Sequence, residues 1–118
     1  MRRDDLIRIR HMLDAAKEAM GFAKGRTRKD FDSDRMLTLS LVKSIEMIGE
    51  AASKVTEECR RSCPEIPWVS IVGMRNRLIH AYFDIDPDRV WDTIQDDLPS
   101  LINDLERILP PGGLNEST

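Results

Sequence analysis

Five polar side chains interrupt an otherwise apolar helical stretch, MRNRLIHAYF, and they are Arg75, Asn76, Arg77, His80 and Tyr82. Arginine with histidine suits a phosphodiester, because a guanidinium binds phosphate oxygens and the negative charge that builds on them. Histidine titrates near neutral pH, so His80 could move the proton of a 2′-hydroxyl or of the leaving oxygen. The stretch therefore suits chemistry on a phosphodiester, with Arg75 or Arg77 on the phosphate.

Other hydrolytic chemistries find little support in the sequence. No Ser or Cys lies beside His80 as a nucleophile, and no Gly-rich loop could hold a nucleoside triphosphate. Cys59 and Cys63 are spaced C-x3-C, and neither His11 nor His80 follows them at zinc-finger spacing. We therefore expect no metal ion and no cofactor, and we expect both thiols to stay reduced.

A helical wheel separates the polar residues into two groups. At about 100° per residue, Arg75 falls within an apolar arc, where a guanidinium must be paired because an unpaired buried charge is costly. Glu46 and Glu50, on the preceding long helical pattern, are the expected partners. An ion pair inside a helical bundle is the purely structural interpretation of Arg75.

Asn76 and His80 share a different face of the same helix with Val69 and Gly73. His80 is five residues from Arg75, a rotation of about 140° on a regular helix. A site that uses both therefore needs a distorted helix or a second copy of the helix from another subunit. We expect a two-fold axis near Gly73 that places both polar strips in one cleft, so that a monomer would be inactive.

Helical patterns must position these residues, and no stretch indicates a strand. Apolar residues recur three and four positions apart, forming one apolar stripe per pattern, over about residues 3–24, 34–61 and 87–108, and the apolar arc with Arg75 belongs to a pattern over about residues 67–82. Pro67 and Pro87 suit the first turn of a helix, and Pro99 predicts a kink or break near Leu98. Gly49 lies where another backbone could come close. The segment GRTRKDFDSD is expected to be a polar connection that ends in a cap, which could be Asp32, Ser33 or Asp34.

The expected fold is all-α: an up-and-down bundle of four helices, or five if Pro99 splits the last. Residues 1–109 form one domain, and the tail 110–118 is expected to be disordered. No apolar run approaches the roughly 20 residues of a membrane span, and the N-terminus does not resemble a signal peptide. We expect a cytoplasmic protein without a membrane partner.

Charge is distributed unevenly along the chain, which has a net charge of −3. Residues 1–35 carry +3, residues 36–83 carry +1, and residues 84–118 carry −7. An RNA should therefore avoid the C-terminal part, which could face a basic partner. Arg26, Arg28 and Lys29 are the N-terminal basic residues expected to lie near the cleft.

The order of motifs is similar to that of a known family. Arg75-x4-His80-x-Tyr82 resembles the R-x4-6-H motif of HEPN domains, and the tyrosine resembles the HepT (DUF86) branch. Four further segments read like that family: IGEAASK at 48–54, EIPWVSIVGMRN at 65–76, HAYFDID at 80–86 and VWDTIQDDLPSL at 90–101. The resemblance covers roughly residues 4–109.

The resemblance implies a HEPN-like homodimer with both motifs in one cleft, and a metal-independent endoribonuclease that cleaves RNA such as tRNA or mRNA. It implies a toxin of a type II or type VII-like toxin–antitoxin system, neutralised by an MNT-type nucleotidyltransferase. Arg75 and His80 would be catalytic, and Asn76 and Arg77 would support them. Tyr82 would be the residue to which the antitoxin adds AMP.

Two other hypotheses remain open. In the first, the chain is a non-catalytic helical module that binds and regulates a nucleotidyltransferase, and the polar strip is its docking surface. In the second, the residues have only structural roles: Arg75 forms a core ion pair, His80 caps a helix, and Tyr82 packs in the core. Harmless expression of the chain without its neighbour would favour the regulatory module over the toxin.

Overall fold

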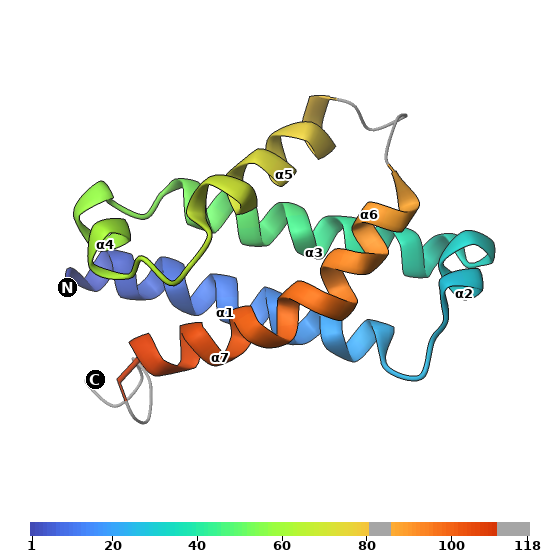
Figure 1. Ribbon diagram of the computed structural model, residues 1–118, viewed down its shortest axis with the longest axis horizontal. Coiled ribbons are helices and arrows are strands. Elements are labelled where there is room, and N and C mark those ends of the chain that lie inside the picture. The colour runs from blue at the N-terminus through green and yellow to red at the C-terminus, as the bar shows by residue number, and fades with distance from the viewer. Residues whose placement is uncertain (81–85, 111–118) are drawn as a thin grey trace.

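A computed structural model describes residues 1–80 and 86–110, with only the backbone given for Ile79 and His80. Across these ranges the chain is an all-α bundle without strands. Helix α1 (Arg3–Ala23) packs along α3 (Arg35–Ser53), α5 (Trp68–His80) packs on α3, and α7 (Leu98–Ile108) packs on α1. The four helices alternate in direction (Figure 1), which confirms the predicted up-and-down arrangement.

The core forms where the predicted apolar stripes meet. Residues spaced three and four apart share one face of a helix, so each stripe turns toward its neighbours. The buried residues of the long helices include Ile9, Leu13, Ala16, Leu37, Leu41, Ile45, Ile48, Ala52, Leu98, Leu101 and Leu105. Trp68 is also buried, and its indole Nε1 donates to the carbonyl of Cys63 at 3.0 Å. The stripes read from the sequence are therefore the faces that the bundle buries.

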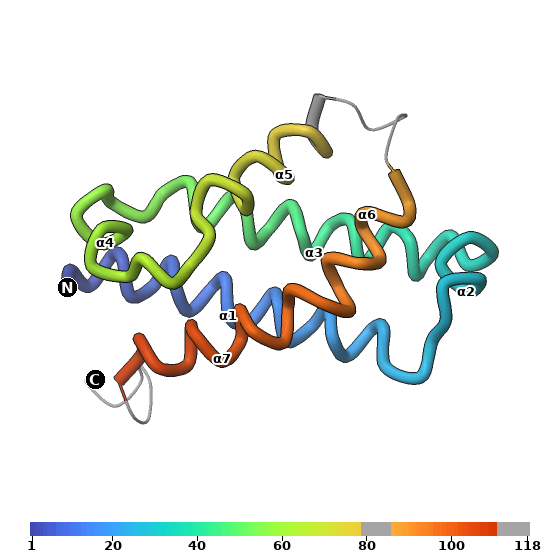
Figure 2. The backbone as a smooth tube through the Cα atoms, in the orientation of Figure 1, coloured from blue at the N-terminus to red at the C-terminus, as the bar shows by residue number. Residues whose placement is uncertain are grey.

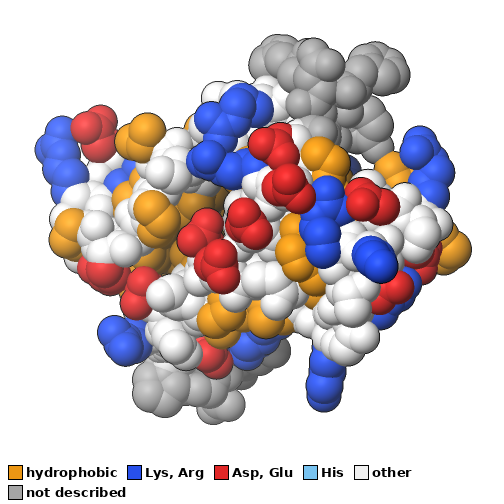
Figure 3. Space-filling view, turned by 45° about the vertical axis from the view of Figure 1, so that its right-hand side comes forward, with side chains coloured by type: hydrophobic (Ala, Val, Ile, Leu, Met, Phe, Trp, Pro, Cys, Tyr) orange, Lys and Arg blue, Asp and Glu red, His pale blue; other side chains and the backbone are white. Residues whose placement is uncertain are grey.

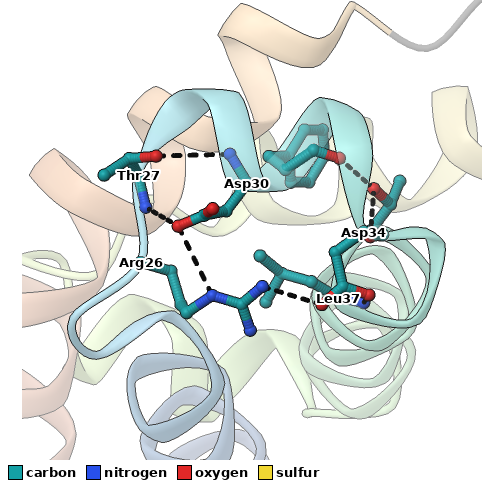
Figure 4. A network of polar contacts seen from close by, with 7 residues as sticks. Arg26, Thr27, Asp30, Asp34 and Leu37 are labelled. Atoms are coloured by element: carbon teal, nitrogen blue, oxygen red, sulfur yellow. Dashed lines mark hydrogen bonds and ion pairs between the residues drawn. The ribbon is translucent and has the colours of Figure 1, made fainter.

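The segment between α1 and α3 is not the irregular connection predicted from its polar composition. It contains a short helix, α2 (Arg28–Ser33), which starts with a capping box. The Thr27 hydroxyl accepts from the Asp30 amide at 3.2 Å, and the Asp30 carboxylate accepts from the Thr27 amide at 2.8 Å (Figure 4). Asp34, one of the three predicted caps, accepts from the Leu37 amide at 3.2 Å and starts α3.

The long helix predicted over residues 34–61 is two helices, α3 and α4 (Glu57–Ser62). Thr56 caps α4 by accepting from the Cys59 amide at 3.2 Å. Asp5 of α1, itself buried, accepts from the Thr56 amide at 2.8 Å and from its hydroxyl at 2.7 Å. The break is thus stabilised by a side chain from another helix, and Figure 2 shows the chain turning through α4 before it enters α5.

The C-terminal arm, residues 86–109, is helical without a break from Pro87 to Ile108, and the predicted change in the helix near Leu98 is a π-helical turn. Asp86 caps α6 (Pro87–Asp92), accepting from the amides of Asp88 and Arg89 at 3.1 and 3.3 Å. A single π-helical turn, η2 (Thr93–Asp97), then joins α6 to α7. Pro99 lies in the first turn of α7, directly after the π-helical turn, and has no N–H to donate there. The arm therefore bends around the core before it follows α1.

Both cysteines are buried and are not joined in a disulfide. Burial raises the pKa of the Cys59 thiol to about 11, with a smaller contribution from the Asp5 carboxylate. The thiol therefore stays protonated at neutral pH and packs as a small apolar side chain. Among the helices that the structure describes, none combines the length and the apolar character needed to cross a bilayer.

Candidate active site

Arg75 is positioned by an unusually close approach of α5 to α3. A Cβ atom added to Gly49 would lie 2.2 Å from the Cβ of Arg75 and 3.2 Å from the carbonyl oxygen of Ile71. Only glycine leaves room for this contact. The prediction that a backbone comes close at Gly49 is confirmed, and the contact fixes where the side chain of Arg75 begins.

The structure selects one of the two predicted partners of Arg75. Its Nη2 atom lies 2.5 Å from Oε2 of Glu50, on the facing helix α3. Glu46, one turn earlier on α3, is instead 3.9 Å from the ammonium of Lys43. The ion pair lies at the surface and not inside the bundle as predicted, because the Arg75 side chain is 27% exposed.

The Arg75 guanidinium also reaches Asn76, which the helical wheel places on a different face of α5. Arg75 Nη1 donates to Oδ1 of Asn76 at 2.9 Å. The arginine side chain is long enough to span the rotation between the two positions, so Arg75 contacts Glu50 on one side and the strip on the other. Asn76 therefore contacts Arg75, and its supporting role in catalysis stays a prediction.

Glu50 holds the guanidinium as a charged partner. A hydrogen bond from Lys54 and the charge of Arg75 keep the pKa of Glu50 below its usual value, so the carboxylate is ionised at neutral pH. The Lys54 ammonium lies 3.4 Å from Oε1 of Glu50. A guanidinium has five N–H groups, and two of those of Arg75 are used by Glu50 and Asn76. Further N–H groups on its Nη atoms remain for an anion such as a phosphate.

The other predicted site residues are placed less completely. Arg77 is exposed and lies about 200° around α5 from Arg75, so the two guanidinium groups leave the helix on different sides. His80 is the last residue of α5, and its side chain lies outside the described part of the structure. Tyr82 lies in the undescribed range 81–85.

The N-terminal arginines expected to attract RNA are neutralised by acidic neighbours. Arg26 Nη2 lies 2.7 Å from Asp34, and its Nε lies 3.5 Å from Asp30 (Figure 4). Arg28 pairs with Asp32 at 2.7 Å and with Asp88 at 2.8 Å. These arginines tie α2 to α3 and α6, so the expectation that they supply positive surface to the cleft is wrong for both.

Sequence reasoning missed two residues of α1 that lie near Arg75. Arg8 and His11 line an open cavity of about 480 Å³ together with residues of α3 and with Arg75 itself. They are spaced i, i+3 beside the apolar stripe of α1, which places them on one face. That spacing was the available signal, but it does not show which helix they face.

A second open cavity, of about 390 Å³, has the opposite charge. It lies between α5 and the C-terminal arm, and its acidic lining residues are Glu65, Asp96, Asp97 and Asp104. Acidic side chains gather near the middle of the face shown in Figure 3. The predicted separation of charge is thus present in three dimensions. Among residues 1–80 and 86–110, no three His, Cys, Asp or Glu side chains are grouped so that they could hold a metal ion.

Comparisons with known proteins agree on one family. The family described as "HepT-like: Ribonuclease HepT-like" matches residues 12–108. A protein of Caldanaerobacter subterraneus subsp. tengcongensis named "Putative RNase" is 36% identical over 86% of this chain and 90% of its own length. A "Probable ribonuclease HepT" of Thermococcus cleftensis is 38% identical over 68% of this chain and 73% of its own. A "Putative RNase" of Methanocaldococcus jannaschii is 32% identical over 80% and 87%. No solved structure matches.

Proposed function

Since this chain belongs to the family of HepT-like ribonucleases, we propose that it is an endoribonuclease that cleaves RNA with Arg75 and His80. The observation that carries the proposal is the arrangement of Arg75. Its guanidinium is held between Glu50 and Asn76, is partly exposed, and lies in the wall of a cavity rich in basic residues. This arrangement leaves the guanidinium both oriented and accessible to a phosphate group.

In the proposed reaction the RNA supplies its own nucleophile. The 2′-oxygen attacks the adjacent phosphorus, and a bond forms between them while the bond from phosphorus to the 5′-oxygen breaks. The proton of the 2′-hydroxyl passes to a base, and the leaving 5′-oxygen gains a proton. His80 serves one of these two transfers, and Arg75 stabilises the charge on the phosphate oxygens. The products are a 2′,3′-cyclic phosphate and a 5′-hydroxyl, and no metal ion is required.

The active unit that we propose is a homodimer with its two-fold axis near Gly73. Two features of α5 favour this face: Val69 is 86% exposed, and a Cβ added to Gly73 would meet no atom within 4 Å. A second α5 could therefore approach closely there. The two strips with Asn76 and His80 would then line one cleft, and each Arg75 could act with the His80 of the other subunit.

Regulation by a nucleotidyltransferase antitoxin completes the proposal. Tyr82 follows the motif directly, so an AMP group added to its phenolic oxygen would place negative charge beside the cleft and repel RNA. In that step the oxygen attacks the α-phosphorus of ATP, pyrophosphate leaves, and the phenol loses its proton. Under this proposal the chain is the toxin of the pair.

The activity is tested with purified protein, a labelled RNA and EDTA. The wild type should cleave, and His80→Ala and Arg75→Ala should each lose at least a hundredfold in rate. Arg61→Ala is a matched control, because Arg61 is exposed on α4 and pairs only with Glu57 at 2.9 Å among the described residues. Cleavage by a folded His80→Ala variant at the wild-type rate would contradict the catalytic role. Absence of cleavage by the wild type would favour the regulatory module.

A further inference from the structure

The cavity beside Arg75 is a groove whose floor is one face of α3. Its floor residues recur at the spacing of a single helical face. Those with charged or long side chains are Lys43, Glu46, Met47 and Glu50 of α3, and Lys54, which directly follows the helix. Arg8 and His11 of α1 form one wall, and Arg75 of α5 forms the other. Because α1 and α5 both pack on α3, the groove follows from the bundle itself. We call it the α3 groove.

The α3 groove is positively charged in a chain whose net charge is −3. Four of its lining residues are cationic, namely Arg8, Lys43, Lys54 and Arg75, against the two carboxylates of Glu46 and Glu50. Those carboxylates are already engaged by Lys43, Lys54 and Arg75. The surplus of positive charge therefore stays available to a ligand.

Arg8 and His11 are the residues of the groove with the most unused hydrogen-bonding capacity. Neither forms an ion pair or a side-chain hydrogen bond with any other residue in the described ranges. Arg8 is half-buried, so its stem is held against the bundle while its guanidinium faces the groove. A half-buried arginine without a partner beside an open cavity is arranged to receive an anion.

We propose that the α3 groove binds the backbone of the RNA substrate, with Arg8 and His11 contacting a phosphate that neighbours the one held by Arg75. Met47, 47% exposed on the floor, supplies an apolar contact for a ribose or a base. A positively charged groove that follows the phosphate backbone is a common way to bind a single-stranded nucleic acid. This inference rests on the proposed function, because it extends the same site along the RNA.

The groove is tested by binding rather than by cleavage. A short single-stranded RNA with 2′-O-methyl groups lacks the attacking hydroxyl, so its affinity for the full-length protein can be measured by fluorescence anisotropy at several salt concentrations. Arg8→Gln removes one phosphate contact, so the slope of log affinity against log salt should flatten by about 0.7. Lys43→Gln, at an exposed position on the floor, should weaken binding in the same direction.

Arg10→Gln is the matched control for Arg8→Gln. Arg10 is an exposed arginine of α1 that pairs with Asp14 at 3.2 Å and does not line the groove. Its substitution removes the same charge from the same helix, so affinity and salt slope should stay close to the wild type. Equal affinities and slopes for the folded Arg8→Gln, Lys43→Gln and Arg10→Gln variants would overturn the inference.

The outcomes for the groove and for the catalytic proposal are separable. If the wild type cleaves unmodified RNA and Arg8→Gln binds normally, the groove is wrong and the ribonuclease proposal stands. If the wild type cleaves no RNA, while Arg8→Gln lowers the affinity and the salt slope and Arg10→Gln does not, the groove binds RNA and the catalytic proposal is wrong. Far-ultraviolet circular dichroism of each variant confirms that the bundle has folded.

Discussion

At the scale of single residues, Glu50 fixes the orientation of the Arg75 guanidinium. The carboxylate is ionised at neutral pH and holds one Nη group of the guanidinium, so the other N–H groups keep a fixed direction. An arginine held in this way loses less freedom when it binds a phosphate than an unrestrained one. We therefore propose that Glu50 positions Arg75 and takes no direct part in the reaction.

Glu50→Gln should lower kcat for RNA cleavage by roughly ten- to a hundredfold, with a smaller effect on KM. The amide cannot form the ion pair, so Arg75 should lose its orientation while the fold is kept. Glu57→Gln is the control, because Glu57 is exposed on α4, pairs with Arg61 at 2.9 Å and does not line the α3 groove. Equal kcat values for the two variants in steady-state assays would show that Glu50 does not position Arg75.

The sequence predicted the types of residue in the site better than their contacts. Glu46 and Glu50 are one turn apart on α3, so periodicity could not choose between them. The helical wheel also placed Arg75 on the apolar arc, because a wheel describes where a side chain leaves the helix and not where its end arrives. Arg8 and His11 come from a third helix, and only the packing of α1 against α3 brings them beside Arg75.

At the scale of the helices, the approach of α3 to α5 supports the whole site. Gly49→Ala should lower the free energy of unfolding by about 1–3 kcal/mol, because the added methyl group overlaps Arg75 and presses on the carbonyl of Ile71. Thermal unfolding measures the change. Gly21→Ala is the control, since a Cβ there meets no atom within 4 Å, and it should be neutral or stabilising. Equal melting temperatures for both variants would contradict the close contact.

The ion pair between Arg26 and Asp34, at the start of α3, should make the free energy of unfolding depend on pH in the acid range. The hydrogen bond from Arg26 lowers the pKa of Asp34 below 3.8, its usual value. The unfolded chain then binds more protons than the folded one below about pH 3.8, so stability is lost as the pH falls through this range. Asp34→Asn keeps a capping side chain and removes the charge, so its melting temperature should depend less steeply on pH there.

The control for Asp34→Asn is Asp14→Asn, at an exposed ion pair of α1. This variant should follow the wild type across the acid range, because pairs between exposed side chains contribute little. Melting temperatures measured by circular dichroism between about pH 2 and 6 distinguish the two. An unchanged slope in Asp34→Asn would contradict the role given to the Arg26 pair.

Helix boundaries were predictable where they depend on local signals. Pro99, Asp34 and Asp86 act within one turn of their own position: the helix forms a π-helical turn just before Pro99, and both aspartates cap helices. The end of α3 depends on Asp5, which is 51 residues from Thr56 in the chain, so no local pattern predicts it. The capping box of α2 was readable at Thr27 and Asp30, but the polar composition of the segment favoured a loop.

At the scale of the whole molecule, positive and negative side chains are concentrated in different cavities. The α3 groove is basic, and the cavity between α5 and the C-terminal arm is lined by four carboxylates. A net negative charge is thus compatible with an RNA-cleaving enzyme, because the field near the site depends on local residues. Because only the cationic side chains of the α3 groove contact phosphates, we expect RNA binding to weaken steeply as the salt concentration rises and to involve only a few phosphates.

We propose that Arg75 of one subunit acts with His80 of the other in a shared cleft. The most direct measurement mixes the inactive Arg75→Ala and His80→Ala variants after subunit exchange and follows RNA cleavage. A mixed dimer keeps one of its two Arg75–His80 pairs intact, and about half of the dimers in an equal mixture are mixed, so the mixture should recover about a quarter of the wild-type rate. Mixed dimers that form but cleave no RNA would contradict the claim.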